Sequence, residues 1–152
     1  MAELPDDIYE EVTRLSEEGN ACANDGNFDL GLSYFQKALA MLPPPIDEPW
    51  AATMWLLTAI GDMHFQMARF PEGRAALMEV VKLFDEARGN PFIRLRLGQC
   101  MLELGEEREA ANWLAGAYLS EGRQLFEGDD PKYLDFIKSR LEPPPAGWPD
   151  GW

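Results

Sequence analysis

Glycines and large apolar residues recur at one fixed spacing in three segments of this chain. Each segment has a glycine, a small residue twelve positions later, a large apolar residue four positions after that, and another small or β-branched residue three positions further on. The three sets are Gly19, Gly31, Phe35 and Ala38; Gly61, Gly73, Leu77 and Val80; and Gly98, Ala110, Leu114 and Ala117. Small residues at these points allow two antiparallel helices to approach closely, while the large residues fill the space between neighbouring hairpins. The pattern predicts a short array of helix hairpins.

Prolines, glycines and capping residues divide the chain into seven expected helices. They cover residues 6–24, 28–42, 49–69, 71–88, 91–105, 106–126 and a last segment from Pro131. Asp47 or Glu48 before Pro49, and Asn90 before Pro91, have the order of a capping residue followed by a first-turn proline. The last helix is expected to cap the array, because a terminal repeat would otherwise expose its stacking face. Its apolar face is formed by Tyr133, Leu134, Phe136, Ile137 and Leu141.

Length and composition predict one helical-repeat domain over residues 1–142 and a Pro/Gly/Trp-rich tail over residues 143–152. The tail tryptophans, Trp148 and Trp152, either dock on the last helix or form an interaction segment; we favour docking, because exposed tryptophan promotes aggregation. No apolar run approaches the ~18 residues of a membrane span. Residues 1–7 lack the basic and apolar regions of a secretion signal, so we expect a soluble cytoplasmic protein.

Residues that carry enzyme or metal chemistry are few and dispersed. Cys22 and Cys100 fall within expected helices, where a thiol behaves as a small buried hydrophobe. With no CxxC spacing and only one histidine, the chain lacks the usual zinc ligands. That histidine, His64, has no serine or cysteine partner at a recognisable spacing, and no glycine-rich phosphate loop is present. We therefore expect no enzyme activity, no metal and no cofactor.

The aligned positions resemble the tetratricopeptide repeat (TPR). The first segment matches best, with Gly19, Phe28, Gly31, Phe35, Ala38 and Pro43 at the family's glycine, aromatic, small and proline positions. The third segment departs from the pattern at Glu107, where an aromatic residue is usual, and the glycine spacings exceed the family's repeat of about 34 residues. The resemblance implies an all-α fold, a short TPR-like α-solenoid of three helix hairpins plus a C-terminal capping helix, which serves protein–protein interaction.

Acidic residues are concentrated at the start of the chain. The net charge is −14, and residues 1–30 contribute −8 of it, because Arg14 alone opposes nine acids there. These acids lie on one surface helix and its flanks, which argues against a pocket for paired-carboxylate hydrolysis. They either serve only solubility or accelerate encounter with a basic protein, by ~10 to 1000-fold in favourable cases. A field of this sign repels nucleic acid and anionic membranes.

The TPR resemblance also implies a ligand groove lined by the first helix of each pair. The groove and the acidic face together give these expected partner-binding residues: Glu10, Glu17, Asn20, Asn24, Asp25, Trp55, Asp62, Phe65, Gln66, Phe92 and Gln99. TPR adaptors for chaperone tails use lysines and arginines in this groove. Here only Asn20 matches that clamp and Ser16 stands where a lysine would be, so a chaperone tail is disfavoured. For Trp55, Phe65 and Phe92, core packing is an equally good interpretation.

Two further stretches carry a second resemblance. They are residues 89–99, with Asn90, Phe92, Arg94, Arg96 and Gln99, and residues 127–134, with Asp130, Pro131 and Tyr133. They look like a bacterial group of small TPR proteins encoded beside Rhs-type and other polymorphic toxins. This resemblance implies an immunity protein, one half of a toxin–antitoxin pair, that neutralises a basic toxin by stoichiometric occlusion. The alternative is a TPR peptide-binding scaffold, for instance an effector chaperone or adaptor. The sequence does not indicate an oligomeric state.

Overall fold

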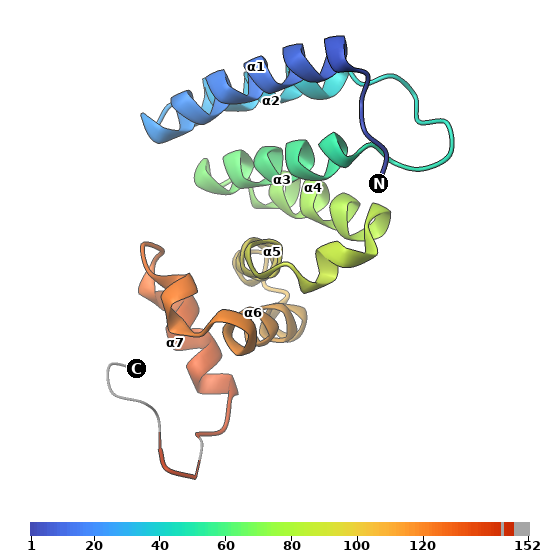
Figure 1. Cartoon of the computed structure of the whole chain (residues 1–152). Coiled ribbons are helices and arrows are strands. Elements are labelled where there is room, and N and C mark those ends of the chain that lie inside the picture. The colour runs from blue at the N-terminus through green and yellow to red at the C-terminus, as the bar shows by residue number, and fades with distance from the viewer. Residues whose placement is uncertain (144, 148–152) are drawn as a thin grey trace. The chain divides into compact units, whose positions relative to one another are not determined.

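The computed structural model describes residues 1–143 and 145–147, and this part of the chain is built from helices joined by short connections (Figure 1). The α-helices are α1 (Asp6–Asn24), α2 (Phe28–Ala40), α3 (Ala51–Gln66), α4 (Phe70–Leu83), α5 (Pro91–Glu103), α6 (Glu107–Glu121) and α7 (Pro131–Arg140). Two 3-10 helices, η1 (Asp85–Gly89) and η2 (Arg123–Phe126), follow α4 and α6. The predicted all-α class, with three helix hairpins followed by a C-terminal helix, is confirmed.

The helices fall into two compact units, Met1–Arg88 and Gly89–Trp152. In the first unit, the α1–α2 and α3–α4 hairpins pack together through α2 and α3. In the second, the α5–α6 hairpin packs with η2 and α7. The expected boundary between a repeat domain at 1–142 and a tail stays a prediction. Trp148 and Trp152, for which we predicted docking, lie outside the described residues.

The three repeat glycines allow the two helices of each hairpin to pack closely. Gly19, Gly61 and Gly98 each lie under the large residue of the same hairpin, so a β-carbon added there would come within 2.8 Å of the Phe35 ring, 2.8 Å of Leu77 Cγ and 2.7 Å of Leu114 Cγ, respectively. All three large side chains are almost completely buried. The spacing read from the sequence therefore marks a real contact. This contact lies within each hairpin, whereas we had assigned the large residues to the space between hairpins.

One helix start has the cap that the sequence predicts, a second has a cap that we did not predict, and a third lacks its predicted cap. The Asn90 side chain accepts a hydrogen bond from the Ile93 N–H at 3.1 Å, and Asp130 accepts one from the Lys132 N–H at 3.0 Å. The predicted cap of α3 is wrong, because this helix begins after Trp50 rather than after Asp47 or Glu48, and it has no side-chain cap.

The N-terminal segment replaces the missing cap of α3. The Ala2 N–H donates to the Pro49 carbonyl at 3.0 Å, and the Ala51 N–H donates to the Ala2 carbonyl at 2.7 Å. Leu4 follows and is buried in the core of the first unit. Because a helix leaves its first N–H groups without partners, an extended segment can satisfy one of them in place of a capping side chain. Figure 1 shows the N-terminus beside the loop that joins α2 and α3.

Four helices, α2, α3, α4 and α6, end earlier than the sequence suggested. α2 ends at Ala40, before the proline run, and α3 ends at Gln66. α4 ends at Leu83 because Phe84 is extended, with φ −132° and ψ 110°, which directs its side chain into the core, where it is 2% exposed. α6 ends at Glu121, because Gly122 follows with a φ of 77° that favours glycine, and the expected continuation to Phe126 is the separate 3-10 helix η2.

Candidate protein-binding surfaces

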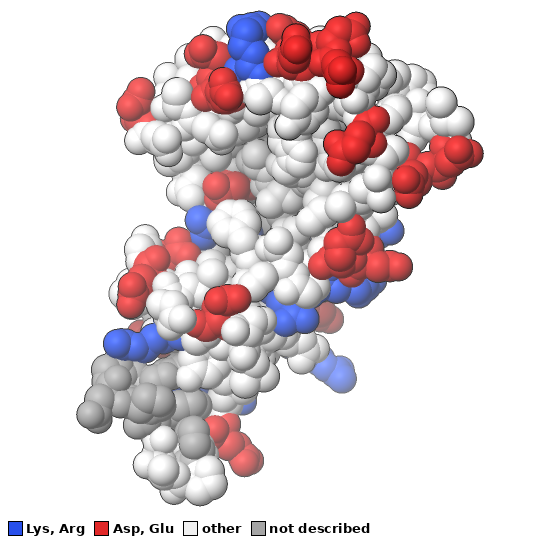
Figure 2. All heavy atoms as spheres, in the orientation of Figure 1, with Lys and Arg blue, Asp and Glu red and all other residues white. Residues whose placement is uncertain are grey.

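The acidic side chains of the first helix form one exposed face. On α1, the residues Asp6, Asp7, Glu10, Glu17 and Glu18 are exposed, as are Glu3 before the helix and Asp25 and Asp29 after it. Glu11 is partly neutralised, because its carboxylate accepts a hydrogen bond of 3.0 Å from Arg14, and this bond lowers the pKa of Glu11. Figure 2 shows acidic side chains gathered over α1 at the top of the view. The face is solvated and does not form a pocket.

Asn20 and Asn24 lie on this helix among the acids. Both are exposed, and seven-residue steps link Glu10, Glu17 and Asn24, so these side chains follow one side of α1. We call Glu10, Glu17, Asn20 and Asn24 the α1 stripe. Ser16, at a groove position of the same helix, is instead buried, and its hydroxyl donates to the Val12 carbonyl at 2.8 Å. The α1 stripe offers carboxylates and amides but no positive charge.

The first helix of the second hairpin presents a mixed aromatic and polar stripe. Trp55, Asp62, Phe65 and Gln66, which we call the α3 stripe, recur at seven-, three- and four-residue intervals and therefore share one side of α3. Trp55 is 38% exposed, which is unusual for so large an aromatic side chain. The Gln66 amide donates to the Asp62 carboxylate at 3.4 Å.

Phe65 has a packing role as well. Its ring meets that of Phe70, at the start of α4, edge to face with the centroids 5.8 Å apart. This contact closes the end of the α3–α4 hairpin and is the core interpretation that we left open. In the α3 stripe, Trp55 is therefore the aromatic side chain most available to a partner.

In the third hairpin, the expected groove residues Phe92 and Gln99 contact other side chains of the same unit. Gln99 is fully buried, and its side-chain N–H donates to the Asp129 carboxylate at 3.1 Å. The expectation that Gln99 contacts a partner is therefore corrected, since its amide is committed inside the unit Gly89–Trp152. The Arg96 guanidinium lies over the Phe92 ring, with Cζ 5.1 Å from the ring centroid. Phe92 is half-buried.

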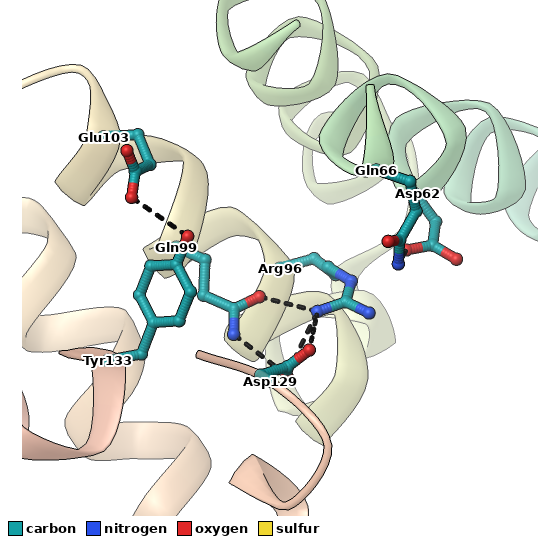
Figure 3. A network of polar contacts seen from close by, with 7 residues as sticks. All are labelled: Asp62, Gln66, Arg96, Gln99, Glu103, Asp129 and Tyr133. Atoms are coloured by element: carbon teal, nitrogen blue, oxygen red, sulfur yellow. Dashed lines mark hydrogen bonds and ion pairs between the residues drawn. The ribbon is translucent and has the colours of Figure 1, made fainter. Parts of the chain in front are cut away.

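A network of polar side chains joins α5 to the connection before α7 (Figure 3). The Arg96 guanidinium donates to Gln99 at 2.8 Å and to the Asp129 carboxylate at 3.1 Å. The Arg96 and Asp129 side chains are only 9% and 16% exposed, so their charges compensate each other in a site with little water. One helical turn after Gln99 on α5, Glu103 accepts a hydrogen bond of 3.0 Å from the Tyr133 hydroxyl and forms an ion pair with Lys132. Burial, together with the Glu103 carboxylate, raises the pKa of the Tyr133 hydroxyl.

This network brings together the two stretches in which we noted the second sequence resemblance. Arg96 and Gln99 come from the stretch 89–99, and Asp129 and Tyr133 come from the stretch 127–134. Asn90 and Asp130 of the same stretches are the two observed helix caps. In the sequence these residues form two separate motifs, and we did not predict that their side chains would contact each other. The only signal was that both stretches combine polar side chains with large apolar ones.

No catalytic constellation is present among the described residues. His64 is half-buried, its Nδ1 atom has no hydrogen-bond partner within the described part of the chain, and burial lowers the pKa of the imidazole. Within residues 1–143 and 145–147, His, Cys, Asp and Glu side chains do not gather in groups of three or more suited to a metal ion. Cys100 is buried and Cys22 half-buried, and neither forms a disulfide within the described residues. In the same residues, no helix combines the length and apolarity needed to cross a bilayer.

Comparison with solved structures identifies the fold as that of TPR domains. No protein-family model matches the sequence, and neither does any curated protein. The Arabidopsis OM64 TPR domain is 12% identical, with a TM-score of 0.66, and the match covers 88% of this chain and 99% of that domain. The second TPR domain of human RPAP3, in complex with the HSP70 peptide SGPTIEEVD, is 12% identical, with a TM-score of 0.63 and 89% and 99% coverage. The first TPR domain of Spaghetti (RPAP3), bound to the HSP90 peptide SRMEEVD, is 16% identical, with a TM-score of 0.62 and 86% and 90% coverage.

Proposed function

We propose that this protein is a non-enzymatic scaffold that binds a segment of another protein along the first helices of its first two hairpins. The α1 and α3 stripes carry the proposal: they combine an exposed tryptophan with exposed amides and carboxylates. Tryptophan supplies a large apolar contact, and the polar groups around it fix orientation, which is the usual division of roles in an interface. Two of the structures with this fold hold peptides, which supports the class of function.

The ligand chemistry proposed here differs from that of those two peptides. Both peptides are acidic at their C-terminal end. The α1 and α3 stripes contain no lysine or arginine, and the α1 stripe lies within the most acidic part of the chain. An acidic tail would therefore be repelled, whereas a basic or amphipathic segment would be attracted. We propose a segment with an aromatic or aliphatic anchor flanked by lysine or arginine.

Selection from a library of random peptides displayed on phage tests this proposal. We expect enrichment of basic peptides with an apolar anchor, and we expect the Trp55→Ala variant to weaken the enriched peptides by about tenfold, since a central tryptophan commonly contributes 1–2 kcal/mol or more. The matched control is Leu119→Ala, at a leucine of α6 that is 75% exposed. Enrichment of acidic peptides, or equal affinities for the Trp55→Ala variant and the wild type, would contradict the proposal.

The acidic face of α1 favours a second candidate, an immunity protein that occludes a basic toxin domain. Exposed carboxylates on a folded helix can imitate the phosphates that such an enzyme binds, and they can accelerate association. The comparisons give no support to a toxin partner, so this part stays a prediction. The two candidates differ in the partner: a scaffold binds an isolated peptide, whereas an immunity protein binds the folded toxin domain and abolishes its activity.

A further inference from the structure

A second surface of the first unit lies where α2, α3 and α4 meet the proline-rich loop. Leu39, Leu42, Pro43, Pro44, Pro45, Pro49, Trp50, Thr53 and Leu83 line an open hollow of about 380 Å³, and apolar atoms form most of its wall. Leu83 is 40% exposed at its rim, and Ile46, in the same loop, is 89% exposed. A cluster of exposed apolar side chains on one surface commonly marks a contact site.

Trp50 also lines a second hollow, which contains two acidic residues. Ala2, Ile46, Asp47, Glu48 and Trp50 line the neighbouring hollow, of about 500 Å³. Glu48 faces the N-terminal ammonium at 3.3 Å, whereas Asp47 makes no ion pair within the described residues. Figure 2 shows acidic side chains at the upper right edge of the molecule, where the loop between α2 and α3 lies. The two hollows therefore differ in the side chains that line them and have Trp50 in common.

The surface is held in shape before any ligand arrives. The Trp50 indole N–H donates to the Pro43 carbonyl at 2.7 Å, which fixes the ring against the loop. The backbone pairing of Ala2 with Pro49 and Ala51 fixes the other side of the same loop. Four prolines restrict the remaining backbone. A rigid surface loses little conformational entropy on binding, so a small contact area can suffice.

This surface is separate from the α1 and α3 stripes. Thr53 lines the apolar hollow, and Trp55, two residues later, belongs to the α3 stripe. Two residues correspond to a rotation of about 200° around an α-helix, so the two side chains leave α3 on nearly opposite sides.

We propose that these two hollows dock a partner segment in which an apolar side chain stands next to a lysine or arginine. The apolar side chain enters the proline-lined hollow, and the cation lies by the Asp47 carboxylate and the Trp50 indole, both of which attract positive charge. Charge decides between this partner and a second copy of the chain. With a net charge of −14, two copies repel each other, and neither offers a cation to Asp47 from the equivalent acidic loop.

The test uses a short fluorescein-labelled peptide with Leu-Arg pairs in a Gly/Ser background, measured by fluorescence anisotropy on the full chain. Control peptides carry Leu-Glu or Ser-Arg pairs. We expect Leu83→Glu and Asp47→Lys each to raise the dissociation constant of the Leu-Arg peptide at least about fivefold. The matched controls are Leu119→Glu and Asp135→Lys, at exposed positions of the second unit, and both should bind as the wild type does.

Several results would overturn the proposal. It is wrong if the Leu-Arg peptide does not bind, if the Ser-Arg peptide binds equally well, or if all four variants weaken binding to the same degree. Loss of binding in Trp55→Ala with full binding in Leu83→Glu would place the peptide on the α3 stripe and refute a separate docking surface. Leu83 and Asp47 are both exposed, so the variants are expected to fold, and circular dichroism checks this.

Discussion

At the scale of single residues, the repeat glycines determine how closely each pair of helices packs. Gly98 illustrates this: a β-carbon there would lie 2.7 Å from Leu114 Cγ and 3.2 Å from the Leu114 backbone nitrogen. The side chain could rotate away, but the backbone of α6 could not move without separating the hairpin. Glycine therefore fits this helical position because no β-carbon can be accommodated there, although alanine has the higher helix propensity.

Gly98→Ala should therefore destabilise the protein. The gain of about 1 kcal/mol in helix propensity is opposed by an overpacking cost of about 1–3 kcal/mol, and we expect a net loss of about 1 kcal/mol in the free energy of unfolding. Urea denaturation measures the loss. Gly89→Ala is the control, since nothing lies within 4 Å of a β-carbon there. If both variants were equally stable, the close contact between α5 and α6 would be wrong.

At the scale of elements, the helix starts differ in what satisfies their first N–H groups. α5 uses the Asn90 side chain, α3 uses the N-terminal segment, and α2 starts after Asn27 without a side-chain cap bond. The same residue type thus has different roles at two helix starts. This difference is invisible in the sequence, where Asn27 and Asn90 both precede an expected helix.

Asn90→Ala should cost about 1 kcal/mol of unfolding free energy, because the Ile93 N–H loses its acceptor. Asn27→Ala should cost clearly less, because no side-chain bond is lost there. Thermal and urea denaturation of the two variants provide the comparison. Equal losses would mean that the Asn90 cap contributes nothing specific.

At the scale of the whole molecule, our proposal of a basic partner rests on charge rather than on shape. The TPR fold is shared with proteins that hold acidic peptides, but this chain carries a net charge of −14, of which residues 1–30 contribute −8. Long-range attraction of this kind acts on the rate of association and is screened by salt. A basic partner should therefore bind faster in dilute buffer.

Reversing Glu10 and Glu17 to lysine should slow the association of a basic peptide from the phage selection by about tenfold at low salt, and should reduce the salt dependence of the rate. Both residues are exposed, so folding should be unchanged. Stopped-flow fluorescence at several salt concentrations measures the rate. Reversal of Glu79 and Glu109, which are exposed on α4 and α6, controls for net charge alone. An equal effect in both pairs would show that the α1 stripe has no special role.

Among the candidate site residues, the sequence predicted the exposure of several polar side chains correctly and that of Gln99 wrongly. Glu10, Glu17, Asn20 and Asn24 are exposed, as expected of polar residues on an amphipathic helix. Gln99 looked the same in the sequence, yet it is fully buried. Its burial depends on Asp129, thirty positions away, whose carboxylate reaches it only after the chain turns back onto α5.

The sequence by itself determined the helices, the hairpin register and the acidic face, because each follows from local spacing: caps, prolines, and small residues opposite large ones. Only the tertiary structure decided which polar residues form hydrogen bonds within the protein, how α3 is capped without a capping side chain, and that Trp50 lines both an apolar hollow and one with two acidic residues. The physical reason is that helix formation and amphipathicity are properties of neighbouring residues. Burial, hydrogen-bond partners and surface shape are set by contacts between residues distant in the chain.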